Sequence, residues 1–190
     1  MDTMVEIVSK RFLLRDLAVE DVTERYLNWL SDADAKKFIT AATKTKSISD
    51  LRRYVHERIG RDNILFLGIF ERTTGLHIGN IKYEPVNSNL GYAIMGVLIG
   101  DPAYRGKGVA AEVIAASAQW LKYNRKIKQI LLGVSNDNSK AVLAYKKIGF
   151  LESSTDFIQQ LPSGAMTMVL NLTDLNDQST PPLCISSKLE

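Results

Sequence analysis

Three short apolar segments in the middle of the chain constrain the fold most strongly. Residues 64–70 form an almost wholly apolar run, and residues 77–86 and 90–99 are two further strand-like segments. Turn signals rich in Thr, Asn, Ser and Gly separate them. Because these connections are too short for the crossovers that parallel strands need, the segments predict an antiparallel meander. Gly91 and Gly96 indicate a bulge or a close backbone approach in its third strand.

Helical periodicity flanks this meander on both sides. Before it, apolar residues recur with helical spacing at 22–30 and at 51–59. After it, a long stripe at 110–121 and a shorter one at 138–148 predict two more helices. The chain therefore combines helices with a sheet, rather than consisting of one or the other.

Local signals mark the ends of these helices. Residues 47–50 have a capping-box pattern, and Gly149 suits the left-handed position that follows a helix. Four further segments have the pattern of strands: 6–17, 129–134, 150–159 and 165–172. The order of elements predicts an α/β (α+β) fold, in which a mostly antiparallel, six- to seven-stranded mixed sheet is flanked by helices.

The length of 190 residues fits one domain, which we place at 1–173. Residues 174–190 are rich in Ser, Thr, Asn, Asp and Pro, and we expect a flexible polar tail there. The net charge of +3 arises from 24 basic and 21 acidic residues. This balance argues against nucleic acid or a membrane surface as a partner.

The cysteine and histidine content excludes further classes. The single cysteine, Cys184, permits neither a disulfide framework nor a cysteine-based metal site. His56 and His77 lie too far apart in sequence to show ligand spacing, so we expect no metal. The N-terminus lacks a signal-peptide pattern, and no apolar run approaches the roughly 18 residues of a membrane span. These features predict a cytoplasmic protein.

A glycine-containing loop joins the third meander strand to the long helix, with the sequence Arg-Gly-Lys-Gly-Val-Ala at 105–110. The unpaired N–H groups and the dipole of a helix start form a site for anions. Glycines at 106 and 108 let a pyrophosphate approach the backbone, while Arg105 and Lys107 add positive charge. A nucleotide P-loop pattern is absent, and Ala111 breaks the dinucleotide fingerprint. The glycines alone would favour a helix entry with a tight turn that binds no ligand.

Two sequence motifs, one in this loop and one after the next strand, indicate what the loop binds. Arg105, Gly108 and Ala110 match the pattern [Gln/Arg]-x-x-Gly-x-[Gly/Ala]. After one more strand, a second pattern, Asn-x-x-Ala-x-x-x-Tyr-x-x-x-Gly-Phe, is matched by Asn138, Ala141, Tyr145, Gly149 and Phe150. With both motifs the chain resembles the GNAT family of N-acetyltransferases over roughly residues 8–172. The resemblance is to the branch of ribosomal-protein-alanine acetyltransferases, which amino-sugar and antibiotic acetyltransferases share.

The resemblance implies the acyl-CoA N-acyltransferase fold, with a splayed central pair of strands into which the pantetheine arm of acetyl-CoA inserts. Residues 96–99 would face residues 131–134 across this opening. An N–H of residue 98 or 99 would polarise the thioester carbonyl. The implied cofactor-binding residues are Val97, Leu98, Ile99, Arg105, Gly106, Lys107, Gly108, Val109, Ala110 and Asn138. Asn138 is also well suited to cap the following helix, and the two roles are compatible.

The resemblance further implies direct attack of an amine on the thioester. Tyr145 is then the candidate general acid that protonates the departing CoA thiolate, and the alternative is a tyrosine of the core. The family's usual carboxylate base is missing, because the third meander strand contains no acidic residue. Glu84 and His77 on the preceding strand are weak candidates for the base, and bulk solvent is another.

The sequence leaves three hypotheses for the function, two of which differ in the amine that is acetylated. The first is an amino-sugar, free or nucleotide-linked, or another small amine, because residues 23–30 resemble relatives associated with nucleotide-activated amino-sugars. Lysines between 36 and 46 would suit a nucleotide diphosphate, although exposed lysines usually only solvate the surface. The second is a protein N-terminus, as in ribosomal-protein acetyltransferases. The third is an acyl-CoA-binding module without catalysis. Homodimerisation is open as well.

Overall fold

The computed structural model describes residues 4–32, 46–158 and 161–173. The predictions for the tail at 174–190, for Cys184 and for the lysines at 36–44 lie outside these residues. The elements follow the chain in this order: β1 (Glu6–Val8), β2 (Phe12–Asp16), the 3₁₀ turn η1 (Val19–Asp21), α1 (Glu24–Ser31), α4 (Ile48–His56), β3 (Leu65–Glu71), β4 (His77–Asn87), β5 (Tyr92–Ile99), the 3₁₀ turn η2 (Pro102–Tyr104), α5 (Val109–Arg125), β6 (Gln129–Ser135), α6 (Ser139–Ile148), β7 (Leu151–Glu152) and β8 (Ala165–Asn171).

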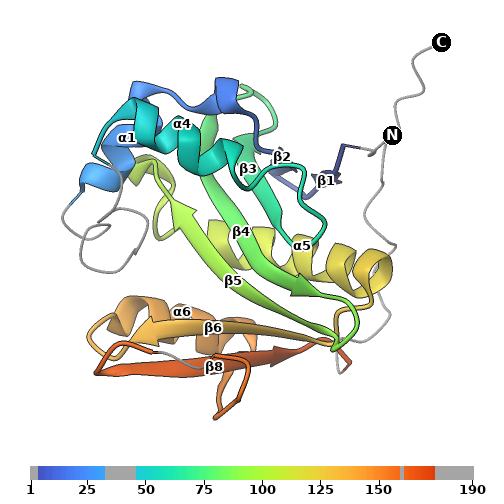
Figure 1. Ribbon diagram of the computed structural model, residues 1–190. Coiled ribbons are helices and arrows are strands. Elements are labelled where there is room, and N and C mark those ends of the chain that lie inside the picture. The colour runs from blue at the N-terminus through green and yellow to red at the C-terminus, as the bar shows by residue number, and fades with distance from the viewer. Residues whose placement is uncertain (1–3, 33–45, 159–160, 174–190) are drawn as a thin grey trace.

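The described strands form one sheet in the order β1-β2-β3-β4-β5-β6-β8-β7 (Figure 1). Every neighbouring pair is antiparallel except β5 and β6, which run parallel. The mixed, mostly antiparallel sheet and its flanking helices confirm the predicted fold class. The meander is confirmed too, as β3, β4 and β5.

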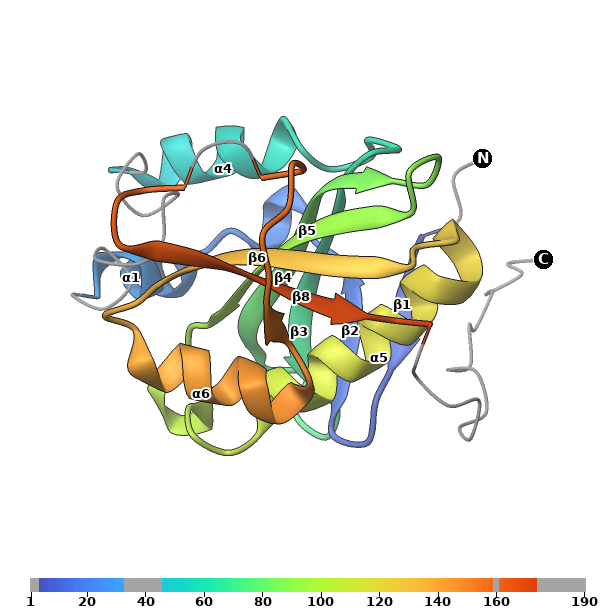
Figure 2. The same cartoon turned by 90° about the horizontal axis from the view of Figure 1, so that it is seen from below.

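Helices cover both faces of the sheet, as Figure 2 shows, with α1 and α4 on one side and α5 and α6 on the other. Alternate residues of a strand point to opposite faces. In β3, Leu67 and Ile69 belong to the apolar cluster beneath α5, whereas Phe66 belongs to the cluster beneath α1 and α4. The run at 64–70 is almost wholly apolar because its strand is covered on both faces.

The sheet has eight strands rather than the predicted six or seven. The segment predicted as one strand at 6–17 is a hairpin of β1 and β2, closed by a bond from the Ser9 N–H to the Phe12 carbonyl (2.8 Å). At the other end, the strand predicted at 150–159 shrinks to the two exposed residues of β7. The polar residues that follow, Ser153 to Asp156, favour turns over strand pairing.

The bulge of the meander lies in the second strand, not in the third as predicted. The register between β4 and β5 shifts between Tyr83 and Val86. Gly91 lies in the turn before β5, with a φ of 72°, and Gly96 is an ordinary ladder residue opposite Lys82. The one extra residue of this bulge therefore lies on the strand that carries Glu84.

The predicted helix signals act as expected. Ser47 caps α4 by accepting a hydrogen bond from the Asp50 N–H (3.1 Å). Gly149 ends α6 with a φ of 110°, in the left-handed region. No helix in the part of the chain described here is long and apolar enough to cross a membrane.

A buried hydrogen bond joins the sheet to α5 and gives a first prediction. Tyr83 and Ser117 are each fully buried, and their hydroxyl oxygens lie 2.8 Å apart. We expect Tyr83→Phe to lower the free energy of unfolding by about 1 kcal/mol, the typical contribution of one such bond. Chemical denaturation of both proteins measures the difference. An unchanged midpoint would contradict this assignment.

Candidate active site

The parallel strands β5 and β6 separate along their length. Their ladder covers only Tyr92 to Ile94, paired with Gln129 to Leu131. In the described structure, β5 residues beyond Ile94 have no ladder partner in β6, although β5 continues to Ile99. This divergence, visible in Figure 1, confirms the predicted splayed pair.

A cavity of about 600 Å³ opens where the two strands separate. Gly96, Val97 and Leu98 line it from β5, and Leu132 and Gly133 line it from β6. Ile99 is not among the residues that line it, and its carbonyl accepts a hydrogen bond from the Arg105 guanidinium (3.0 Å). Unpaired strand groups beside a cavity suit an extended amide-containing chain such as pantetheine.

The glycine loop lies between this strand and α5. Gly106 and Gly108 have φ angles of 72° and 74°, so both adopt the left-handed conformation that glycine tolerates. Gly108 is the N-cap of α5, and no described side chain caps that helix. The start of α5 therefore presents its first N–H groups without a competing side-chain acceptor, as an anion site requires.

The side chain of Arg105 holds the loop in place. Its guanidinium donates to the carbonyls of Ile99 (3.0 Å) and Gly100 (2.9 Å) and to the carboxylate of Asp32 (2.8 Å). Its backbone N–H donates to the Pro102 carbonyl (3.2 Å). These contacts assign Arg105 a structural role in tying the loop to the end of β5.

A second arginine reaches the loop from the β1–β2 turn, and sequence reasoning missed it. Arg11 donates to the Lys107 carbonyl (3.1 Å) and forms an ion pair with Glu112 in the first turn of α5 (2.7 Å). One of its guanidinium nitrogens lies 4.0 Å from the position that a Cβ would take at Gly108. The Lys107 side chain is exposed. Nothing local marks Arg11, because its contacts span about a hundred residues.

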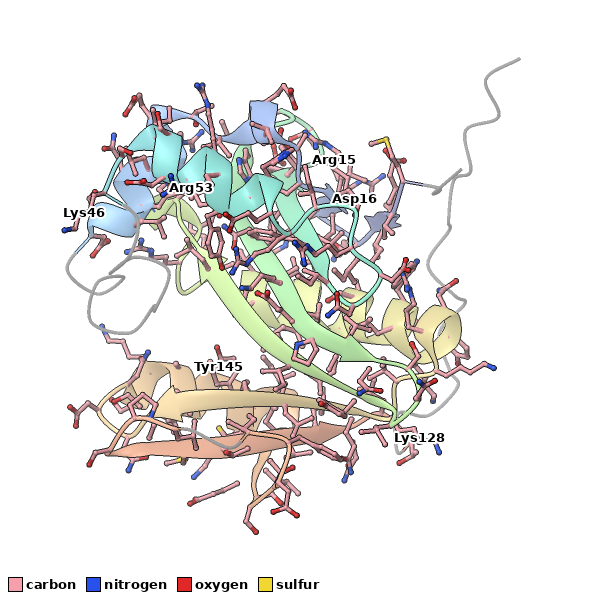
Figure 3. All side chains as sticks on the ribbon, in the orientation of Figure 1. Arg15, Asp16, Lys46, Arg53, Lys128 and Tyr145 are labelled. Atoms are coloured by element: carbon pink, nitrogen blue, oxygen red, sulfur yellow. The ribbon has the colours of Figure 1, made fainter. Side chains whose placement is uncertain are left out.

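Asn138 and Tyr145 belong to α6, on the other side of the opening. Asn138 accepts a hydrogen bond from the Ala141 N–H (3.2 Å), which confirms its capping role. It does not line the cavity described above, so its cofactor-binding role stays a prediction. Tyr145, labelled in Figure 3, does line the cavity. The centroid of its ring lies 5.6 Å from that of Phe150. Burial raises the pKa of Tyr145 to about 12, so the phenol is protonated at neutral pH.

The far wall of the cavity comes from α4 and β4 and is charged. Lys82 donates to the Tyr54 hydroxyl (2.7 Å) and to Glu84 (2.5 Å), and Arg58 also donates to Glu84 (3.1 Å). Burial alone would raise the pKa of Glu84, but the hydrogen bond and charge of Lys82, with Arg58, hold it below its usual value. Glu84 is therefore a carboxylate at neutral pH, in contact with two cations.

His77, the other candidate base, lies away from the cavity. Its ring stacks on Phe70 with 4.7 Å between the centroids, and it meets Trp29 edge-on at 5.1 Å. Burial lowers its pKa to about 4, against the pull of nearby Asp21. The geometry makes His77 a neutral part of an aromatic cluster between β4 and α1.

A sheet splayed at one parallel pair, a glycine loop at the start of the adjacent helix and a cavity between them define the acyl-CoA N-acyltransferase class of folds. Residues 11–151 match the family model described as an acetyltransferase (GNAT) domain, and the chain belongs to this family. It is therefore an N-acetyltransferase.

Individual relatives are distant. An N-acetyltransferase 9-like protein of Caenorhabditis elegans is 22% identical over 187 residues, which are 87% of this chain and 90% of that protein. Spermidine N-acetyltransferase from Vibrio cholerae, solved with CoA and spermine, superposes with a TM-score of 0.72 and 19% identity over 86% of this chain and 96% of that one. RimL, a ribosomal L7/L12 α-N-protein acetyltransferase solved with coenzyme A, superposes with a TM-score of 0.74 and 14% identity over 88% and 97%. At these identities the structural matches establish the fold alone.

Proposed function

We propose that this protein transfers the acetyl group of acetyl-CoA directly to a primary amine, in the cavity between β5 and β6. The observation that carries the proposal is the continuity of that cavity. It joins the unpaired edge of β5 and Tyr145 to a charged wall on α4 and β4. The cofactor and the amine would enter from these two sides.

The residues present fit acetyl-CoA as the co-substrate. Val97 and Leu98 line the cavity on the edge of β5 that has no ladder partner in β6, and the backbone groups that face this edge offer hydrogen bonds to the amides of the pantetheine arm. The bare N-terminus of α5, behind Gly108, offers N–H donors to the pyrophosphate. Two of the structural relatives above were solved with CoA, which supports the same choice of co-substrate.

The transfer is one substitution at the acetyl carbonyl. The nitrogen lone pair forms the new C–N bond, and the C–S bond breaks to release the thiolate. Tyr145 would supply the proton that makes CoA a neutral thiol. A phenol whose pKa is raised to about 12 is still fully protonated, and a thiol with a pKa of about 8.5 leaves moderately well.

We propose Glu84 as the group that receives the proton as the C–N bond forms. Because the pKa of Glu84 is lowered, it is too weak a base to deprotonate the free ammonium substrate efficiently. Solvent would do that before binding, and Glu84 would accept the more acidic proton of the bond-forming intermediate.

This order of proton transfers predicts a pH profile. With a peptide α-amine, whose pKa is about 7.7–8.0, kcat/KM should rise with pH between 5.5 and the amine pKa and then level off. Glu84→Gln should lower kcat/KM by the same factor at every pH in this range, because Glu84 is already ionised at pH 5.5. Steady-state kinetics from pH 5.5 to 9.5 measures both curves. A flat wild-type profile below the amine pKa would contradict this order.

For the acceptor, the charged wall favours a polar amine over a polycation. Six ionisable residues line it, three positive and three negative: Asp50, Arg53, Glu57, Arg58, Lys82 and Glu84. A wall without net charge gives little attraction to a polyamine such as spermine. An amino-sugar or other small amine and a protein N-terminus both fit this wall, and the amino-sugar is our first proposal.

An amine panel tests the proposal. It contains glucosamine, a nucleotide-linked amino-sugar, short peptides and spermine, and CoA release is followed with acetyl-CoA. Turnover of glucosamine above the others supports the first proposal, and turnover of peptides favours the N-terminal alternative. Calorimetric binding of acetyl-CoA without turnover of any amine would favour the acyl-CoA-binding module. Absence of binding would overturn the proposed function.

A further inference from the structure

The far wall of the cavity, where it is formed by β4, includes a residue with a buried polar atom that has no hydrogen-bond partner. Asn80 lies on β4, in register with Gly68 of β3 and Leu98 of β5, and it lines the cavity. The residue is 7% exposed, and its Nδ2 is buried with no hydrogen-bond partner. Buried amides almost always find partners, so this group calls for an explanation.

Its position sets Asn80 apart from other buried polar groups. Among the described residues, two buried side-chain nitrogen or oxygen atoms lack partners, the Nδ2 of Asn80 and the Nε1 of Trp120. Trp120 packs in the apolar cluster beneath α5 and does not line the cavity, so its nitrogen has no ligand to meet. Asn80, in contrast, is one of the residues that line the cavity where a substrate would bind.

The neighbours of Asn80 on the same face already have partners. Lys82, which follows Asn80 by two positions on β4, donates hydrogen bonds to Tyr54 and Glu84. Glu84 also accepts a hydrogen bond from Arg58. These side chains satisfy one another without a substrate. For the Nδ2 of Asn80 the described structure supplies no acceptor, and Asn80 pairs in register with Leu98, on the strand expected to hold the thioester.

We propose that Asn80 binds the acceptor substrate by donating a hydrogen bond to an oxygen atom close to the reacting nitrogen. This inference rests on the proposed acetyl transfer and concerns its substrate. The acceptor class is an amine with a carbonyl or hydroxyl oxygen a few bonds from the nitrogen. A peptide N-terminus and an amino-sugar both have such an oxygen, whereas a plain alkylamine does not.

The reason for selectivity is that a site with a buried donor rejects a ligand without the matching acceptor. An alkylamine would leave the Asn80 N–H groups both unpaired and cut off from water. An amine with a suitably placed oxygen satisfies them. The residue would therefore discriminate between substrates without taking part in the chemistry.

The test compares Asn80→Leu with the wild type on three acceptors: alaninamide, glucosamine and isobutylamine. Leucine has a similar shape and no donor. We expect kcat/KM to fall about tenfold or more for whichever oxygen-bearing acceptor the wild type uses, mainly through KM, and to stay unchanged for isobutylamine. A fall with alaninamide identifies the carbonyl of a peptide as the partner, and a fall with glucosamine identifies a sugar hydroxyl.

The controls separate this inference from the proposed function. Asn124→Leu removes an amide that donates to the Trp120 carbonyl (2.9 Å) outside the cavity lining, and it should leave all three values unchanged. If Asn80→Leu does not fold, the smaller Asn80→Ala also removes both N–H donors without adding charge and should show the same selective loss. An equal loss on all three amines, or none, overturns the role of Asn80 while acetyl transfer stands. If the wild type acetylates no amine, the proposed function fails and this inference with it.

Discussion

We expect Gly108→Val to weaken acetyl-CoA binding on the order of 100-fold, with the fold retained. Gly108 has a φ of 74° at the N-cap of α5, and a β-branched residue in that region costs about 1–3 kcal/mol. A valine there would relax by moving the loop, and its side chain would cover the N–H groups meant for the pyrophosphate. The nearest described atom to the new Cβ is the Arg11 guanidinium at 4.0 Å, so no clash forbids folding.

Gly75→Val is the matched control for this variant. Gly75 has a φ of 69° in the turn between β3 and β4, and no described atom lies within 4 Å of the position that a Cβ would take there. Its backbone strain should therefore be similar, but it is not part of the glycine loop. Calorimetry with acetyl-CoA should give an unchanged Kd for Gly75→Val. Similar binding by Gly108→Val and the wild type would refute the assignment of the loop.

The elements that could be predicted from the sequence are those with local signals. The meander follows from connections that are too short for crossovers, and α4 and α6 are bounded by Ser47 and Gly149, which act on their own helices. The splayed pair came from the family resemblance, not from the strands themselves. Its ladder stops at Ile94, at a point that no local pattern marks.

The incorrect predictions concern features that are determined by pairing between segments distant in the sequence. The segment predicted as one strand folds back on itself, so that β2 pairs with β1 on one side and with β3, some fifty residues further along the chain, on the other. The bulge opposite β5 was assigned to the glycines of β5, although the shift lies between Tyr83 and Val86. Glycine content indicates where a backbone can deform, but the ladder determines where it does.

In the candidate site, too, residues in local motifs could be predicted, whereas residues that the fold brings in from distant segments could not. The glycine loop and Tyr145 belong to contiguous motifs, so their positions could be predicted. The guanidinium of Arg105 was predicted to add positive charge beside the anion. In the structure it donates to Ile99, Gly100 and Asp32, and its role in cofactor binding stays a prediction. Arg11 and Asn80 reach the site only through the fold, and a single arginine or asparagine carries no pattern that reveals this.

Tyr145→Phe should lower kcat about 100-fold or more while the Kd for acetyl-CoA stays nearly constant. The change removes only a hydroxyl group, so the packing against Phe150 is kept. General acid catalysis typically contributes 10²–10⁴-fold, and a phenol with a pKa near 12 has its proton available at every working pH. Without it, the thiolate must leave as an anion into a partly apolar cavity.

Tyr83→Phe provides the matched comparison, because it too removes one hydroxyl from a tyrosine, in this case a fully buried one. The Tyr83 hydroxyl bonds Ser117 beneath α5, outside the cavity lining, so its loss should lower stability and leave kcat unchanged. Tyr145→Phe should show the opposite pattern, with kcat reduced and stability nearly kept. Steady-state assays of CoA release measure kcat, and chemical denaturation curves measure stability. If Tyr145→Phe turned over like the wild type, Tyr145 would be a packing residue, and solvent would protonate the thiolate.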